Sequence, residues 1–153
     1  MYGPDLDHIE SRLAFLQALC GRAERVLAAE RGGADPAVVR LAAERIVHVA
    51  AEGVTDVGSH LLDRIIMRDA SSYEDIVDIL HQEGMFADDL HAFLRELALM
   101  RKPLVQQYDR VDGDKLARLA GELAGKLPAF IEAVRRFVAK ETGLADPAGR
   151  RSE

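Results

Sequence analysis

The sequence predicts an all-α protein folded as an up-down bundle of about five helices. Over long segments, apolar residues recur three and four positions apart, which is the spacing of one helix face. Capping and stop residues separate these segments, and no segment shows the alternating pattern of a strand. Short connections between consecutive helices favour antiparallel neighbours, and therefore a bundle.

The first two helices are predicted from long apolar stripes with clear ends. The first begins near Leu6 and ends at the glycines of positions 32–33, and its stripe is Leu6, Ile9, Leu13, Leu16, Cys20, Ala23 and Leu27. The second opens with Asp35 as N-cap and Pro36 at the first helical position. It should run to about Met67, with an apolar face of Val39, Ala42, Ile46, Val49 and Val57.

The third and fourth helices are predicted from capping residues and helix dipole charges. Ser71 and Glu74 form a capping-box pattern that opens a short third helix before Gly84. A longer helix is expected from Ala87 to about Tyr108, with acidic residues at positions 88–89 near its positive N-terminus. It should bend near position 103, where a proline lacks the amide that the carbonyl four residues earlier requires.

The fifth helix completes the predicted domain. Asp112 and Asp114 can cap its N-terminus, and Pro128 interrupts an otherwise continuous stripe of Leu116, Leu119, Leu123, Leu127, Ile131, Val134 and Val138. Residues 1–141 are therefore expected to form one helical domain. Residues 142–153 lack periodicity and collect Gly, Pro and charge, which predicts a flexible C-terminal tail.

The composition indicates a cytoplasmic protein without a membrane span. The formal net charge of −6 argues against a surface built for non-specific nucleic-acid binding, so any such contact should be local. No apolar run approaches the roughly 18 residues of a spanning helix, and the N-terminus lacks the pattern of a secretion signal. Cys20 is the single cysteine, and its place in an apolar stripe predicts a small buried thiol, as suits a reducing cytosol.

The segment from Arg101 to Tyr108 carries the main functional pattern. Arginine, four residues, Gln106, one residue and tyrosine follow one another. This resembles the arginine, four residues, histidine, one residue, tyrosine motif of the HepT-like toxin family in the HEPN superfamily, with Gln106 at the histidine position. Other family-like segments occur in order at 9–13 (IESRL), 56–60 (DVGSH), 72–73 (SY) and 111–112 (VD), so the likeness covers roughly residues 5–138.

The resemblance implies a homodimeric helical bundle in which two copies of the motif face a shared cleft. It also implies a metal-independent endoribonuclease that acts as a toxin beside a small nucleotidyltransferase antitoxin, with RNA as its substrate. In such pairs the partner is said to switch the chemistry off by adding AMP to the motif tyrosine, which by position is Tyr108.

The chemistry of the motif residues agrees only in part with cleavage. The planar, permanently charged fork of Arg101 suits binding of a phosphodiester and of its transition state, with Lys102 beside it. Imidazole can exchange protons near neutrality, whereas the amide of Gln106 can only form hydrogen bonds. Acid-base catalysis typically contributes about 10²–10⁴-fold, so glutamine in place of histidine should leave little cleavage unless another group substitutes. His60 is the expected substitute, and Tyr108 is a further candidate for proton donation or substrate positioning.

Plainer interpretations stand beside these assignments. Arg101 could be a rim residue paired with an acid, Lys102 a solvated side chain, and Tyr108 a core aromatic whose hydroxyl reaches the surface. Asp56 and His60 match the family pattern and are expected to line the cleft or orient Arg101. As whole-protein alternatives, the chain could be a catalytically inactive homodimer that binds a nucleotidyltransferase or a nucleotide in the same cleft, or a structural adaptor.

A polar row on the second predicted helix raises the question of a metal. His48, Glu52, Asp56 and His60 recur at every fourth position, and neighbours in the row could share an ion. Each step of four residues turns about 40° around the helix, so all four side chains cannot converge. We therefore expect a polar stripe, with neither a metal nor a cofactor.

Overall fold

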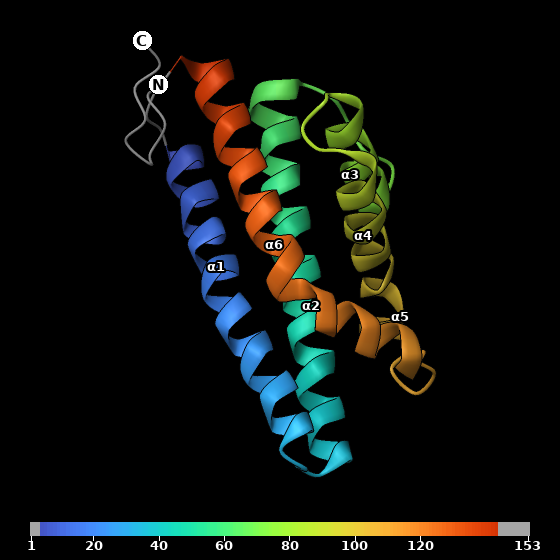
Figure 1. Cartoon of the computed structure of the whole chain (residues 1–153). Helices are drawn as coiled ribbons and strands as arrows, with labels where there is room; N and C mark the ends of the chain where they lie inside the picture. The colour runs from blue at the N-terminus through green and yellow to red at the C-terminus, as the bar shows by residue number, and fades with distance from the viewer. Residues whose placement is uncertain (1–3, 144–153) are drawn as a thin grey trace.

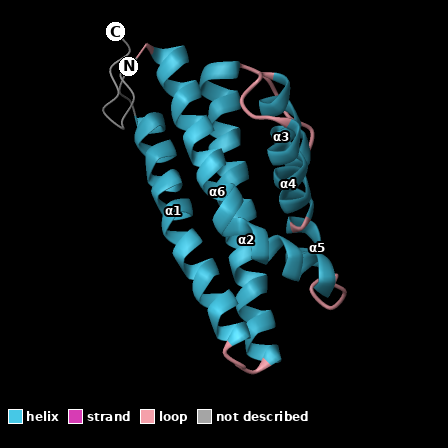
Figure 2. Ribbon diagram, in the orientation of Figure 1, coloured by secondary structure: helices cyan, strands magenta, loops and turns pink. Residues whose placement is uncertain are grey.

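The computed structural model describes residues 4–143, and within them the chain is a bundle of helices without strands (Figures 1 and 2). The predicted all-α bundle of about five helices is confirmed, because two of the observed helices, α4 and α5, together take the place of the predicted fourth helix. The elements in order are α1 Pro4–Arg31, α2 Pro36–Leu61, the π-helical turn η1 Leu62–Ile66, α3 Tyr73–Gln82, α4 Asp88–Leu99, α5 Arg101–Gln106 and α6 Gly113–Thr142.

Three long helices form the main body of the bundle. α1 runs antiparallel to both α2 and α6 and contacts both along its length, while the α3–α4 pair packs against the other side of α2 (Figure 1). The core between them consists of aliphatic side chains with Phe130, and its largest fully buried members include Leu13, Leu16, Leu61, Leu94, Leu97, Leu119 and Leu123. α2 is thus central, since α1, α3, α4, α5 and α6 all contact it.

The ends of α1 and α2 agree with the prediction. Gly33 adopts a φ of 84°, which is the left-handed conformation that a glycine tolerates after a helix. Asp35 caps α2 by accepting a hydrogen bond of 2.9 Å from the backbone N–H of Ala37. The helical path continues through η1 and ends at Met67, whose φ of 60° reverses the chain. The π-turn itself was not predicted.

The cap of α3 lies one residue later than predicted. Ser72 is the N-cap, and its Oγ accepts a 3.1 Å hydrogen bond from the N–H of Asp75. The Asp75 carboxylate in turn accepts a 2.8 Å bond from the N–H of Ser71. The expected Ser71–Glu74 capping box is therefore wrong by one position. Two consecutive serines followed by two consecutive acids allow both registers, so the local sequence could not decide between them.

The predicted fourth helix is divided into two. α4 ends at Leu99, and α5 restarts at Arg101 and ends at Gln106, so the expected helix to Tyr108 is too long by two residues. The break lies just before Pro103 because proline has no N–H for the Leu99 carbonyl. The position of the perturbation was therefore predicted to within a few residues, although a break rather than a bend results.

α6 begins at the predicted cap and bends partway along (Figure 1). The Asp112 carboxylate accepts 3.1 Å hydrogen bonds from the N–H groups of Asp114 and Lys115. Pro128 lies inside the helix, where its missing N–H explains a bend. Gly143 ends α6 with a φ of 68°. The predicted tail from 142 lies almost wholly outside the described residues.

Two glycines let neighbouring helices approach α2 closely. A Cβ atom built on Gly53 would lie 2.7 Å from Leu16 Cδ2 of α1, and one built on Gly58 would lie 2.4 Å from Ile76 Cγ2 of α3. Both distances are shorter than real Cβ contacts, so a larger residue would force a neighbour to move. At Gly53 this neighbour is the flexible end of Leu16, whereas at Gly58 it is the methyl on the Cβ of Ile76. The placement of α3, which carries a residue of the candidate site, therefore depends on Gly58.

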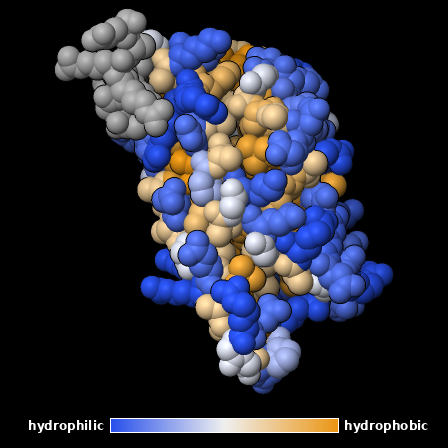
Figure 3. Space-filling model, viewed as in Figure 1, coloured by the Kyte–Doolittle hydropathy of each residue, from blue (hydrophilic) through white to orange (hydrophobic). Residues whose placement is uncertain are grey.

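The surface is mixed in character. In the view of Figure 3, hydrophilic side chains predominate and hydrophobic ones form patches between them. The large apolar or aromatic side chains that are exposed include Phe15, Tyr73, Val105 and Tyr108. Within residues 4–143 there is no helix long and apolar enough to cross a bilayer.

Candidate functional site

Arg101 is held in a defined orientation by two neighbouring helices. It is the first residue of α5, and its Nε donates a 2.6 Å hydrogen bond to Glu52 Oε1 of α2. Its guanidinium carbon lies 4.2 Å from the centre of the Tyr73 ring at the start of α3, which is a cation–π contact. The side chain is only 25% exposed. The plainer expectation of an arginine paired with an acid is thus met, and the pairing also fixes the guanidinium.

His48, to which the sequence analysis gave no catalytic role, lies next to the Arg101–Glu52 ion pair. His48 Nε2 is 3.4 Å from Glu52 Oε1, the same oxygen that accepts the bond from Arg101. Glu52 therefore lies between an imidazole and a guanidinium. The spacing of four residues between His48 and Glu52 was visible in the sequence, but nothing there indicated that Arg101 contacts Glu52.

Asp56 and His60 belong to a second cluster, one helical turn further along α2. Arg12 Nε donates a 2.7 Å hydrogen bond to Asp56 Oδ2, and His8 Nε2 lies 3.1 Å from the same oxygen. His60 Nε2 is 3.5 Å from Asp56 Oδ1. Burial of Asp56 acts to raise its pKa, but the hydrogen bonds and charges of Arg12 and His8 outweigh burial and lower the pKa below the ordinary value. The ion pairs found for Asp56 are thus with this cluster rather than with Arg101.

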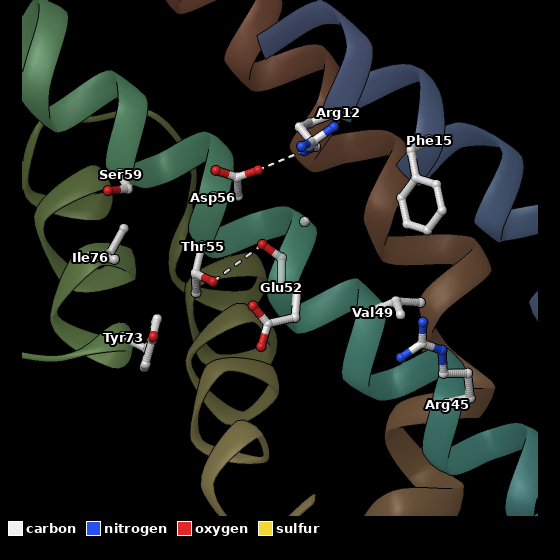
Figure 4. A pocket seen from close by; sticks show the side chains of 11 residues that line it. Arg12, Phe15, Arg45, Val49, Glu52, Thr55, Asp56, Ser59, Tyr73 and Ile76 are labelled. Atoms are coloured by element: carbon white, nitrogen blue, oxygen red, sulfur yellow. Dashed lines mark hydrogen bonds and ion pairs between the residues drawn. The ribbon is translucent and has the colours of Figure 1, made fainter. Parts of the chain in front are cut away.

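A groove of about 680 Å³ runs past Glu52 of the first cluster and Asp56 of the second. Arg101 and His48 lie behind Glu52 rather than in the lining of the groove. Figure 4 shows α2 along its floor, with Phe15 of α1 on one side and Tyr73 of α3 on the other. Both aromatic side chains are partly exposed, at 36% and 41%. The residues that line it are Arg12, Phe15, Arg45, Val49, Glu52, Gly53, Thr55, Asp56, Ser59, Tyr73 and Ile76.

The remaining motif residues lie at the surface. Lys102 and Gln106 are exposed on α5, and Tyr108 follows the end of that helix with 75% of its surface accessible. The alternative of Tyr108 as a core aromatic is therefore wrong, because the helix stops before it and turns its side chain out of the packed interior. Lys102 has the exposure expected of a solvated side chain.

The polar row of α2 is divided between the two clusters. His48 and Glu52 lie beside Arg101, whereas Asp56 and His60 gather with His8 of α1. The four side chains do not converge, in agreement with the helical rotation argued from the sequence. Sequence reasoning missed His8, because the register of α1 against α2 cannot be read from either helix alone.

Comparison with known proteins agrees with this architecture. The family model described as "Ribonuclease HepT-like" matches residues 19–135. "Putative RNase YutE" of Bacillus subtilis (strain 168) is 33% identical over 143 residues, which cover 94% of this chain and 96% of the relative. The solved structure of YutE, described as a cytosolic protein of unknown function, superposes with a TM-score of 0.74 at 34% identity and covers 95% of this chain and 98% of that one.

A more distant solved structure shares the fold. The tri-AMPylated HEPN toxin of Shewanella oneidensis, solved in complex with its MNT antitoxin, has a TM-score of 0.73 at 15% identity, over 88% of this chain and 99% of that one. The match to the family model spans well over half of the chain, and the relative is similar over nearly its whole length. This protein therefore belongs to the HepT-like ribonuclease family.

Proposed function

We propose that this protein cleaves RNA phosphodiester bonds without a catalytic metal ion, as the toxin component of a toxin–antitoxin pair. The observation that supports this most directly is the state of Arg101. Glu52 and Tyr73 fix its guanidinium through Nε and the ring face, and within the described residues its two Nη atoms make no hydrogen bond. The outer edge of the fork is thus available to a phosphate.

Phosphate binding is assigned to Arg101, assisted by Lys102. A guanidinium donates parallel hydrogen bonds to two phosphate oxygens and can stabilise the added charge of the transition state. Lys102 lies next in the chain and is exposed, so its flexible ammonium can reach the same phosphate. Asp56 was expected near the substrate. Its negative charge is directed at Arg12, so this proposal leaves it out of phosphate binding.

Proton transfer is assigned to His48. In the proposed step the 2′-oxygen of RNA forms a bond to phosphorus, its proton passes to a base, and the bond from phosphorus to the 5′-oxygen breaks as that oxygen gains a proton. His60 was expected in this role, but Glu52 and His60 are eight residues apart, about 12 Å along α2. His48 shares the Glu52 oxygen with Arg101, so it is the nearer imidazole.

Gln106 and Tyr108 take supporting roles in this proposal. Gln106 can orient a phosphate or a ribose hydroxyl by hydrogen bonds, and cleavage should be slow because the motif lacks its own imidazole. Tyr108 is proposed to help position the RNA and to accept AMP from a small nucleotidyltransferase antitoxin. Its exposure supports access by such an enzyme, and the structural neighbour from Shewanella oneidensis is described as AMPylated and bound to an antitoxin.

Two further properties follow from family membership as proposals. The protein is proposed to form a homodimer in which two copies of the motif share one cleft, so that RNA contacts both. A cytoplasmic location is also proposed, and the description of YutE as a cytosolic protein supports it. Size-exclusion chromatography with light scattering tests the dimer directly.

The cleavage experiment compares matched arginine variants. Purified protein is incubated with single-stranded and structured RNA in the presence of EDTA, and products are resolved on a gel. We expect slow cleavage by the parent and loss of cleavage in Arg101→Ala and His48→Asn. Arg95→Ala should cleave like the parent, since Arg95 pairs with Asp78 rather than with Glu52, the partner of Arg101. Cleavage by the parent no faster than by Arg101→Ala would refute the proposal.

The catalytically inactive binding protein is the second candidate function, and Gln106 is the observation that favours it. In that case the parent binds its nucleotidyltransferase partner or a nucleotide but does not cleave RNA. The variant Gln106→His separates the candidates. A slow parent that Gln106→His accelerates by up to about 10²–10⁴-fold indicates an enzyme with a weakened acid-base group. Cleavage by Gln106→His together with none by the parent indicates an inactive relative.

A further inference from the structure

Three side chains from two helices converge at the edge of the groove. His8 of α1 and the pair Asp56 and His60 of α2 each offer one nitrogen or oxygen, and these atoms all lie within 4.8 Å of one another. The two imidazole rings are 4.1 Å apart between centres. Each of the three side chains is about one-third exposed, so the cluster can be reached from solvent while remaining fixed by the helices.

The spacing and chemistry of these atoms match a transition-metal site. His8 Nε2 lies 3.1 Å from Asp56 Oδ2, and His60 Nε2 lies 3.5 Å from Asp56 Oδ1. Ligands arranged tetrahedrally at about 2.0–2.1 Å from Zn²⁺ are about 3.3 Å apart. The two imidazoles face different oxygens of Asp56, and one atom from each residue lies within 4.8 Å of the others, so binding an ion requires the side chains to move closer together. Two imidazoles and one carboxylate also form a donor set that Zn²⁺, Co²⁺ and Ni²⁺ favour over Mg²⁺ or Ca²⁺.

We propose that His8, Asp56 and His60 bind one divalent transition-metal ion of the zinc class, which links α1 to α2. The proposal is independent of RNA cleavage, because these residues are not assigned to phosphate binding or proton transfer. The site has three protein ligands, and a fourth position remains for water. An ion there would add a further bridge between two helices that already meet at this point through the hydrogen bonds of Asp56 and the ring contact of His8 with His60.

Arg12 is the internal competitor of the proposed ion. Its Nε donates a 2.7 Å hydrogen bond to Asp56 Oδ2, and its positive charge repels a cation in the cluster. Arg12 is 43% exposed, so it can turn toward solvent when an ion binds. Removal of Arg12 should therefore strengthen metal binding. If Arg12 instead served to hold the cluster together, its removal would weaken metal binding.

A second histidine pair in the molecule provides a matched control. His81 and His91 stack face to face, with ring centres 4.0 Å apart and planes 2° from parallel. Ring nitrogens present their lone pairs in the ring plane, so stacked imidazoles do not direct them at a common point. Each is also hydrogen-bonded to its own carboxylate, His81 to Asp88 and His91 to Asp78. His91 is 23% exposed, similar to His8, which makes His91→Asn a comparable substitution.

The test titrates chelator-treated protein with Zn²⁺ alone and with Co²⁺ alone. Calorimetry should give one ion per chain, and Co²⁺ should develop visible absorption bands of a low-symmetry site. His8→Asn and His60→Asn should weaken Zn²⁺ binding tenfold or more, since even outer partners of a metal site contribute roughly 10- to 100-fold. His91→Asn should bind like the parent. Arg12→Gln should bind roughly two- to fivefold more tightly.

Other outcomes would overturn the site. Equal binding by the parent and His8→Asn, or equal losses in His8→Asn and His91→Asn, would show that the cluster does not bind the ion. Weaker binding by Arg12→Gln would show that Arg12 supports rather than opposes the cation. Circular dichroism of each variant separates loss of metal binding from loss of fold, and Arg12→Gln tests the proposal without removing a ligand. RNA cleavage is not a readout, so its absence would leave this result unaffected.

Discussion

Substitution of Gly58 by alanine tests how tightly α3 is docked on α2. An alanine Cβ would lie 2.4 Å from Ile76 Cγ2 and 3.4 Å from Leu80 Cδ1. The Ile76 methyl is attached directly to Cβ, so it can move away only if the side chain changes rotamer or α3 shifts by about 1 Å, the difference from an ordinary contact. Both changes disturb a residue that is 8% exposed.

The expected cost follows from two opposing contributions. Alanine in place of glycine inside a helix stabilises it by about 1 kcal/mol, whereas overpacking a core typically costs about 1–3 kcal/mol. We expect Gly58→Ala to lose about 1 kcal/mol of unfolding free energy, which lowers the melting temperature by about 2–4 °C in a chain of this size. Urea unfolding followed by circular dichroism measures it.

A matched glycine makes this prediction refutable. Gly121 lies in α6, and a Cβ atom built on it meets nothing within 4 Å. Gly121→Ala should therefore gain up to about 1 kcal/mol from helix propensity alone. If Gly58→Ala is stabilised as much as Gly121→Ala, the close approach of α3 is wrong. In a double-mutant cycle, Gly58→Ala should cost less unfolding free energy in an Ile76→Ala background than in the parent, because the clashing methyl is then absent.

Two further predictions concern a buried thiol and a helix cap. Burial and the charge of Glu24 raise the pKa of the Cys20 thiol, so the reactive thiolate is scarce in the folded protein. Iodoacetamide should therefore label Cys20 slowly at pH 8, and labelling should become fast once urea unfolds the chain. Mass spectrometry measures the extent of labelling. Rapid labelling of the folded protein would contradict this. Ser72→Ala should lower the free energy of unfolding by about 1 kcal/mol through loss of the α3 cap, and Ser71→Ala should lower it less. If urea unfolding shows the larger loss for Ser71→Ala, Ser71 is the N-cap, as first predicted from the sequence.

The fold was predictable because its signals are local. Apolar spacing, the Asp35 cap with Pro36, and the Asp112 cap each act within one or two helical turns, and the structure contains all of them. The errors were local as well. The Ser71–Glu74 box failed because two registers were equally good. The single helix to Tyr108 failed because the chain breaks just before Pro103 and the second piece ends at Gln106.

Only those features of the candidate site that lie within a single helix could be predicted from the sequence. The importance of Arg101 came from the motif, and the row from His48 to His60 came from the four-residue spacing. Its division into two clusters depends on side chains from other helices, Arg101 for one and His8 for the other. Those pairings depend on helix register and crossing, which arise from packing of the whole bundle.

The two ends of the motif are held to the protein to different degrees. Arg101 is fixed to the packed body through Glu52 and Tyr73, whereas Tyr108 lies in the connection beyond Gln106. Connections of this kind can open and close locally at little cost while the core remains folded. A charged adduct on Tyr108 could therefore be added or removed without unfolding any helix. In the proposed function such an adduct would block the approach of RNA, while Glu52 and Tyr73 kept the guanidinium of Arg101 in position.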